Sequence, residues 1–244
     1  MKHNRLLYLI IISFLLTISL VEVIRGASVD DNILSYIVDP KSENIDFYWK
    51  DDEGEIIGSL GNLEMLLDSE YKQLIFATNG GMYNMDRSPK GLFIYQSETI
   101  TPLDKSSGQG NFYLKPNGVF YITTDNVAAI CKTDKFKDKG KIKYATQSGP
   151  MLVIDGKIHP SFKKGSSNLH IRNGVGILPD GSVLFAMSKT KVNFYDFASY
   201  FQKLGCKNAL YFDGYVSRTY LPEKNWIQKD GNFGVIIGVT KILE

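Results

Sequence analysis

Residues 193–214 read NFYDFASYFQKLGCKNALYFDG, and within them a helical pattern gives way to a strand pattern. Asn193 is a residue type that caps helices, and Gly205 can adopt the left-handed conformation in which many helices end. The run ALYF at 209–212 is short, apolar and aromatic, as in a buried strand. Between cap and stop, apolar residues recur every three or four positions and predict a helix over 194–204: Phe194, Phe197, Ala198, Phe201 and Leu204.

A second unit of the same kind lies earlier in the chain. Ser59 precedes a predicted helix over 60–68 with leucines on one face, and an apolar strand follows at 73–78. Both strands run into polar loops that contain glycine, Asn79-Gly80-Gly81 after the first and Asp213-Gly214 after the second. Because loops at strand ends commonly carry binding and catalytic groups on a rigid frame, we expect function at these two loops.

Three predicted hairpins and two further strands make up most of the remaining chain. Asn-Gly and Asp-Gly pairs favour the positive φ angles of tight turns. The predicted hairpins join 112–115 to 119–123, 151–154 to 157–159 and 175–178 to 183–187, and single strands are expected at 44–49 and 233–239. No repeat or linker divides the chain after about residue 30. The sequence therefore predicts a single α+β domain with a mixed or antiparallel sheet core, flanked by helices 60–68 and 194–204.

Composition indicates a globular protein and argues against nucleic acid, metal ions and cofactors as ligands. Of 244 residues, 43% are hydrophobic and 22% are charged, which suits a packed core. The net charge of +2 is too small to indicate nucleic-acid binding. Cys131 and Cys206 could form one disulfide in an oxidising compartment, or Cys206 could be a buried apolar side chain. Without CxxC spacing or an HExxH motif, the sequence predicts neither a metal nor a cofactor.

Residues 1–27 have the composition of an export segment. A basic head at residues 2–5 precedes an apolar run from 6 to about 20, as in a secretory signal. Ala27 is small enough for a cleavage site, but Arg25 stands where a second small residue is wanted. The apolar run continues to Ile24 and approaches the length of a membrane span. A cleaved signal peptide, a retained membrane anchor and a buried helix remain open, and the first two place residues 28–244 outside the cytoplasm, whether periplasmic, secreted or membrane-anchored.

Two uncharged loops carry the first candidate site residues. Asn79 can donate and accept hydrogen bonds, and Gly80 and Gly81 let backbone amides approach a ligand closely, although the same residues suit an ordinary turn. A second group of polar residues beside a glycine lies at another strand end, where a simple turn is the alternative: Gln147, Ser148 and Gly149.

Two further loops carry the charged candidates. His170 and Arg172 share a face of an extended segment, and Asn173 follows them. Arg172 offers a fixed fork of donors that suits phosphate, unless it is a surface arginine in contact with solvent. Asp213 follows an apolar strand, so partial burial would raise its pKa and suit acid–base chemistry; otherwise it caps a turn. The same loop continues with Gly214, Ser217 and Arg218.

Five motifs in this order resemble the phosphodiester glycosidase family. They are NGGMY at 79–83, QSGPML at 147–152, IRNGVGI at 171–177, LGC at 204–206 and ALYFDG at 209–214. The resemblance extends over roughly residues 70–240. After Gly214 the chain departs from the family, because Tyr215 and Arg218 stand where many members have flexible glycines.

The resemblance implies a hydrolase that cleaves the glycosidic bond of a sugar-1-phosphodiester, such as an envelope or extracellular glycan phosphate. The implied catalytic residues are Asp213 as acid–base or electrostatic group, Arg172 as phosphate clamp and Asn79 as an orienting amide. The implied substrate-binding residues are Gly80, Gly81, Gln147, Ser148, Gly149, His170, Asn173, Gly214, Ser217 and Arg218. Two alternatives remain open: a non-catalytic protein that binds envelope glycans, and a structural envelope protein without a ligand. Membrane association would involve only the N-terminal segment.

Overall fold

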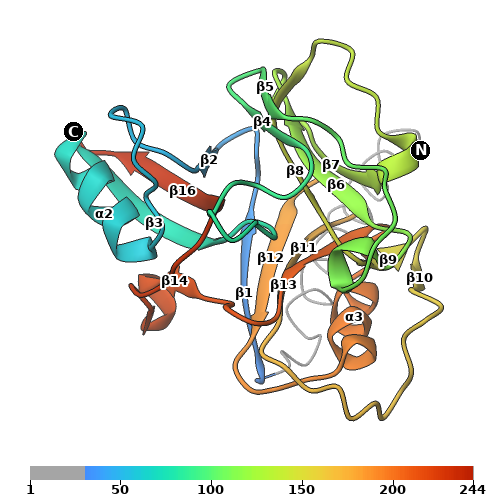
Figure 1. Cartoon of the computed structure of the whole chain (residues 1–244). Coiled ribbons are helices and arrows are strands. Elements are labelled where there is room, and N and C mark those ends of the chain that lie inside the picture. The colour runs from blue at the N-terminus through green and yellow to red at the C-terminus, as the bar shows by residue number, and fades with distance from the viewer. Residues whose placement is uncertain (1–30, 244) are drawn as a thin grey trace, which may run out of the picture. The chain divides into compact units, whose positions relative to one another are not determined.

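The computed structural model describes residues 31–243, and from Asn32 onward they form one compact unit. Three β-sheets and two α-helices build this unit (Figure 1). All strand pairs within residues 31–243 are antiparallel, so the α+β prediction is confirmed and the sheets are antiparallel rather than mixed. The export segment predicted at 1–27 lies outside the described residues. No helix in the described part is long and apolar enough to cross a membrane.

The first sheet has six strands in the order β1-β12-β11-β13-β9-β10. Their bounds are β1 Ile33–Val38, β9 Met151–Ile154, β10 Lys157–Ile158, β11 Asn173–Ile177, β12 Val183–Ser188 and β13 Ala209–Asp213. Two predicted hairpins are confirmed as the pairs β9–β10 and β11–β12. Helix α3, Phe194–Lys203, packs against β9 and β10 beside this sheet (Figure 1). Asn193 caps it as predicted, and Gly205 follows its end with a φ of 82°.

The second sheet has the order β15-β14-β3-β16-β2 and is covered by α2, Leu60–Ser69. Its strands are β2 Asn44–Tyr48, β3 Lys72–Asn79, β14 Thr219–Leu221, β15 Trp226–Ile227 and β16 Ile236–Ile242. Ser59 caps α2 as predicted. The last strand starts later than the expected residue 233, because the preceding segment bonds to loops: the N–H of Phe233 donates to the carbonyl of Gly58 (2.6 Å).

The third sheet has the order β5-β4-β8-β6-β7. Its strands are β4 Phe93–Tyr95, β5 Glu98–Thr101, β6 Gly118–Thr123, β7 Ala128–Lys132 and β8 Ile142–Ser148. The hairpin predicted over 112–123 is wrong, because a 3₁₀ turn covers Asn111–Tyr113 and β6 pairs with β7 and β8. The side chain of Asn117 donates to the carbonyl of Phe112 (2.9 Å) and closes this turn, while Pro116 has no N–H for a ladder.

The three sheets share one core around Phe120 of β6. Its ring centroid lies 5.7 Å from that of Phe47 in β2, 6.0 Å from Phe185 in β12 and 6.3 Å from Phe212 in β13. Each sheet therefore contributes aromatic side chains to a single cluster. Both cysteines are free, and Cys206 is buried, so the apolar interpretation of Cys206 is confirmed and no disulfide forms.

Candidate active site

The side chain of Asn173 joins the first sheet to the second. Asn173 begins β11, and its Nδ2 donates to Thr78 Oγ1 (3.0 Å) and to both oxygens of Asn79, the carbonyl (2.9 Å) and Oδ1 (3.0 Å), at the end of β3. Its Oδ1 accepts from the backbone N–H of Asp213 (3.0 Å) and from Ser217 Oγ (3.3 Å). Asn173 is only 1% exposed, and a buried amide with all its groups engaged fixes the geometry around it. This one side chain thus brings two of the predicted loops together.

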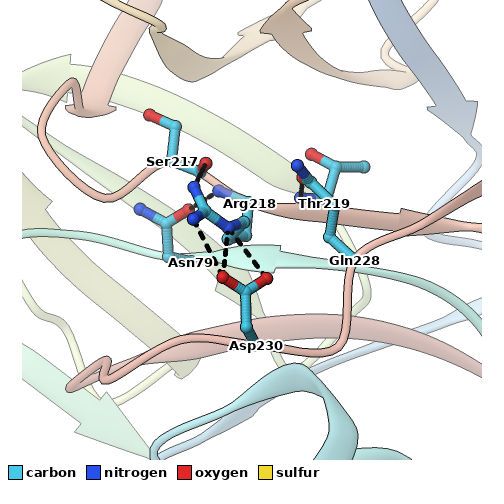
Figure 2. A network of polar contacts seen from close by, with 6 residues as sticks. All are labelled: Asn79, Ser217, Arg218, Thr219, Gln228 and Asp230. Carbon is cyan, nitrogen blue, oxygen red and sulfur yellow. Dashed lines mark hydrogen bonds and ion pairs between the residues drawn. The ribbon is translucent and has the colours of Figure 1, made fainter.

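Asn79 is fully buried, and half of its side-chain amide is unused. Its Oδ1 accepts from Asn173 Nδ2 and from the backbone N–H of Arg218 (3.0 Å; Figure 2). Its Nδ2 makes no hydrogen bond with any described residue. A buried donor without a partner costs about 1–3 kcal/mol of folding free energy. In folded proteins such a group usually binds a ligand or a water molecule, or belongs to a strained functional site. Asn79 therefore supplies a fixed donor at the junction of the sheets.

Asp213 is a half-buried carboxylate at the end of β13. Its Oδ1 accepts from the backbone N–H groups of Gly214 (2.6 Å) and Tyr215 (2.9 Å). Its Oδ2 accepts no hydrogen bond from residues 31–243. Burial raises the pKa of this carboxyl, and the two backbone hydrogen bonds oppose that rise in part. One oxygen is fixed and the other is available, which suits a group that exchanges a proton or faces positive charge.

Arg172 is packed inside the domain instead of facing an open cleft. Its guanidinium donates to Val192 O (2.9 Å), Tyr211 Oη (3.3 Å) and both Asn168 O (2.9 Å) and Oδ1 (2.7 Å), and it stacks 3.6 Å from the ring centre of Phe194. It is 0% exposed and forms no ion pair with a described carboxylate. Burial lowers the pKa of this guanidinium. The expected fork for phosphate is thus occupied by the protein itself, and Arg172 contributes an uncompensated positive charge and a support for Tyr211.

Gly214 packs directly against Tyr211, whose hydroxyl accepts a hydrogen bond from Arg172. A Cβ on Gly214 would overlap that hydroxyl. We expect Gly214→Ala to displace the loop. If the chain hydrolyses the sugar-1-phosphodiester expected from its sequence, turnover should fall at least about tenfold, because catalysis is sensitive to misplacement of about 1 Å. Unfolding free energy should fall by about 1–3 kcal/mol, as in other overpacked sites. Urea unfolding of this variant is compared with the parent. Its activity is compared with Gly156→Ala, which adds backbone strain at a φ of 80° but no overlap, since a Cβ there would meet open space. Equal activity of the two variants would contradict the prediction.

Gln147 and Ser148 serve as supports within the chain. The Gln147 side chain is fully buried; it accepts from the backbone N–H groups of Leu92 (3.0 Å) and Asp104 (2.9 Å) and donates to Asp104 O (2.6 Å) and Thr133 Oγ1 (3.3 Å). Ser148 Oγ donates to the carbonyl of Phe212 (3.1 Å), directly before Asp213. The Gln147 amide has no group left to orient a sugar, whereas Ser148 helps to position the end of β13.

The predicted glycines and His170 lie around the site with local roles. The N–H of Gly80 donates to Val235 O (2.8 Å) and is not free for a phosphate. A Cβ on Gly80, Gly81 or Gly149 would lie within 2.7 Å of a neighbouring side chain, so close packing alone requires glycine at these positions. His170 is exposed, and its backbone pairs with Val192. Within the described part of the chain, no group of three or more His, Cys, Asp or Glu residues is placed to hold a metal ion.

Arg218 is turned toward the loop that precedes β16. Its Nε lies 2.9 Å from both carboxylate oxygens of Asp230, its Nη2 lies 2.8 Å from Oδ2, and its Nη1 donates to Ser217 O (3.0 Å; Figure 2). The next residue, Thr219, donates its backbone N–H to Gln228 Oε1 (2.9 Å). The ion pair raises the pKa of Arg218 and lowers that of Asp230. The charge of Arg218 is therefore compensated within the protein.

Tyr83 and Arg87, in the loop after β3, were not among the site residues expected from the sequence. Burial and the charge of Asp213 raise the pKa of the Tyr83 hydroxyl, and the charge of Arg87 lowers it. Arg87 Nη1 donates to Asn232 Oδ1 (3.1 Å), two residues beyond Asp230. Tyr83 was part of a recognised motif, but Arg87 stands in a short polar stretch that reads as an ordinary turn.

Comparisons with known proteins agree with this fold. Residues 72–239 match the family model described as phosphodiester glycosidase. The chain is 40% identical over 190 residues to the uncharacterized protein YigE of Escherichia coli (strain K12), which covers 78% of this chain and 74% of that protein.

Two solved structures have a similar fold. One is the catalytic domain of zebrafish N-acetylglucosamine-1-phosphodiester alpha-N-acetylglucosaminidase, auto-inhibited by its pro-peptide (TM-score 0.56, 13% identity, 87% of this chain and 84% of that one). The other, from Burkholderia pseudomallei K96243, is described as an exported protein (TM-score 0.54, 9% identity, 85% of this chain and 73% of that one). At such identities a structural likeness concerns the fold alone, whereas the family model extends over most of the sequence. The chain belongs to the phosphodiester glycosidase family.

Proposed function

We propose that this protein hydrolyses the glycosidic bond of a sugar-1-phosphodiester outside the cytoplasm. Membership of the family supports the reaction class. The observation that carries the proposal is the Asp213 carboxylate, whose Oδ1 is held by two backbone N–H groups while its Oδ2 is free of partners among residues 31–243. The composition of residues 1–27 supports the location.

In the proposed reaction, water attacks the anomeric carbon and the bond from that carbon to the phosphate oxygen breaks. The phosphate monoester leaves with the bonding electrons, and Asp213 Oδ2 accepts the proton of the attacking water. Because a phosphate is a good leaving group, the reaction does not need the second carboxylate that ordinary glycosidases use as general acid. A carboxyl with a raised pKa is the stronger base once ionised, which suits this role near neutral pH.

Asn79 and Arg172 support the same step in different ways. Asn79 Nδ2 is a buried donor without a partner in the described chain, and we assign it to an oxygen of the bound sugar. Arg172 does not contact the substrate in this proposal. Its buried and unpaired positive charge favours binding of an anion nearby, and its hydrogen bond to Tyr211 positions the loop that carries Asp213.

The test is hydrolysis by the purified full chain of a panel of methyl sugar-1-phosphates, each matched with its neutral methyl glycoside. We expect free sugar and methyl phosphate from at least one diester, followed by NMR, and no product from the neutral glycosides. Absence of product from the whole panel would contradict the proposal. Binding of a diester without product would favour a glycan-binding protein, to which the unpartnered donor of Asn79 is equally suited.

A further inference from the structure

The described residues include three arginines, at positions 87, 172 and 218. A phosphodiester carries a full negative charge, and arginine is the side chain whose planar fork of donors matches phosphate oxygens best. Two of the three are committed elsewhere. Arg172 is fully buried with four of its N–H groups bound to the protein, and Arg218 is neutralised by Asp230.

Arg87 is the arginine whose guanidinium remains available. Its side chain makes one hydrogen bond within the described chain, from Nη1 to the neutral Oδ1 of Asn232 (3.1 Å), and it forms no ion pair there. The residue is only partly buried, so solvent and ligands can reach it. The neighbouring carboxylate of Asp86 is occupied by the backbone N–H (3.0 Å) and hydroxyl (2.6 Å) of Ser88.

The backbone of Arg87 is held in place from several directions. Its φ of 63° is in the left-handed region, which is uncommon for a residue with a long side chain and persists where the surroundings fix it. Its N–H donates to Asn84 O (2.8 Å), and its carbonyl accepts from Trp49 Nε1 (3.0 Å). A Cβ on Gly58 would lie 2.9 Å from Arg87 Nη1, so glycine at that position leaves room for the guanidinium.

Shared neighbours connect Arg87 to the loops of the candidate site. Asp230 and Asn232, two residues apart on one loop, hold the guanidinium groups of Arg218 and Arg87 respectively. Arg218 also donates its backbone N–H to Asn79 Oδ1, which places this loop beside the site. The Arg87 carbonyl and the Tyr83 side chain both pack against Gly234, and the carbonyl of the next residue, Val235, accepts from the backbone N–H of Gly80 (2.8 Å).

We propose that Arg87, positioned by Asn232, binds the phosphate of the substrate and makes the site specific for phosphodiesters over neutral glycosides. This inference rests on the function proposed above, because it concerns the same site. The sugar then lies toward Asp213 and Asn79, and the phosphate lies toward the loop that holds Arg87.

The experiment measures binding and turnover separately, with Arg87→Asn as the main variant, because asparagine tolerates the left-handed backbone better than most residues. Calorimetric titration with a methyl sugar-1-phosphate and with its neutral methyl glycoside gives the preference for phosphate. We expect Arg87→Asn to weaken diester binding by about 10- to 100-fold and to leave neutral-glycoside binding unchanged, as for a lost hydrogen bond to a charged group. Arg87→Lys should lie between the two, since lysine keeps the charge but loses the fork.

Lys229→Ala is the matched control, since it removes one positive charge from the same loop and breaks only the ion pair of this exposed lysine with Glu64 (2.6 Å). It should bind the diester like the parent. Unchanged diester binding by Arg87→Asn, or an equal loss for both ligands, would overturn the inference, as would a parent that binds no diester. If the parent binds the diester through Arg87 but does not cleave it, the proposed function fails and the inference stands. If Arg87→Asn cleaves the diester with the parent's KM, the function stands and the inference fails.

Discussion

Asp213→Asn should lower the turnover of a sugar-1-phosphodiester by about 10²–10⁴-fold, the usual contribution of a positioned acid or base. Asparagine keeps the shape of the side chain, and its Oδ1 can still accept the backbone N–H groups of Gly214 and Tyr215. The substitution removes only the charge and the exchangeable proton, so KM should change far less than kcat. Steady-state kinetics on the diester check the result, and near-full turnover would make Asp213 a simple turn cap.

The stability of the same variant gives an independent readout. Because burial raises the pKa of Asp213 in the folded protein, the folded state holds this proton to higher pH than the unfolded state does. The parent therefore loses free energy of unfolding as the pH rises from the ordinary carboxyl range through the raised pKa. Asp213→Asn lacks this loss, and its stability relative to the parent should rise over that interval. Urea unfolding at a series of pH values measures the difference, and a parallel pH dependence of the two proteins would contradict it.

Phe120→Ala should lower the free energy of unfolding by about 3–5 kcal/mol, the range found when a buried phenylalanine is truncated. The Phe120 ring is fully buried and contacts rings from both other sheets, so the cavity would open where all three sheets meet. In a protein of this size the midpoint of thermal unfolding should fall by roughly 6–20 °C. Ile227→Ala, at a position 55% exposed in an edge strand, should change stability by no more than about 0.5 kcal/mol. Similar losses in the two variants would show that Phe120 does not join the sheets.

The helices and the strands that follow them could be predicted because their signals are local. Periodic apolar residues and the caps Ser59 and Asn193 determine α2 and α3 within a few positions. The hairpin expected at 112–123 failed because a proline and the side chain of Asn117 favour a compact turn over a strand. A run of strand-forming residues does not reveal such a side-chain contact in advance.

The candidate site was less predictable because its assembly depends on contacts between distant segments. Asn173 bonds to a strand end 94 residues earlier in the chain, and nothing in the sequence near it marks it as the central residue. The polar groups of Gln147 and Arg172 could bind a ligand or the protein itself equally well. In the structure both side chains are fully buried, and they bind groups of the protein. Arg87 lies in a short polar stretch that resembles an ordinary turn. The feature that makes it a candidate, a guanidinium without an acidic partner in the described chain, is visible only in the folded structure.

The bridge made by Asn173 also limits how this protein could be re-engineered. A catalytic loop supported by its own hairpin can be grafted onto another scaffold, or the protein can be split beside it. Here the necessary side chains extend from Asn79 to Asp230, and the strand that follows them, β16, lies beside β3 inside the second sheet. Any fragment that contains both sheet ends connected by Asn173 must extend at least from Thr78 to Ser217. Transfer of this chemistry to another protein would therefore require transfer of almost the whole domain, and any shortening should proceed from the outer turns, such as the one between β9 and β10.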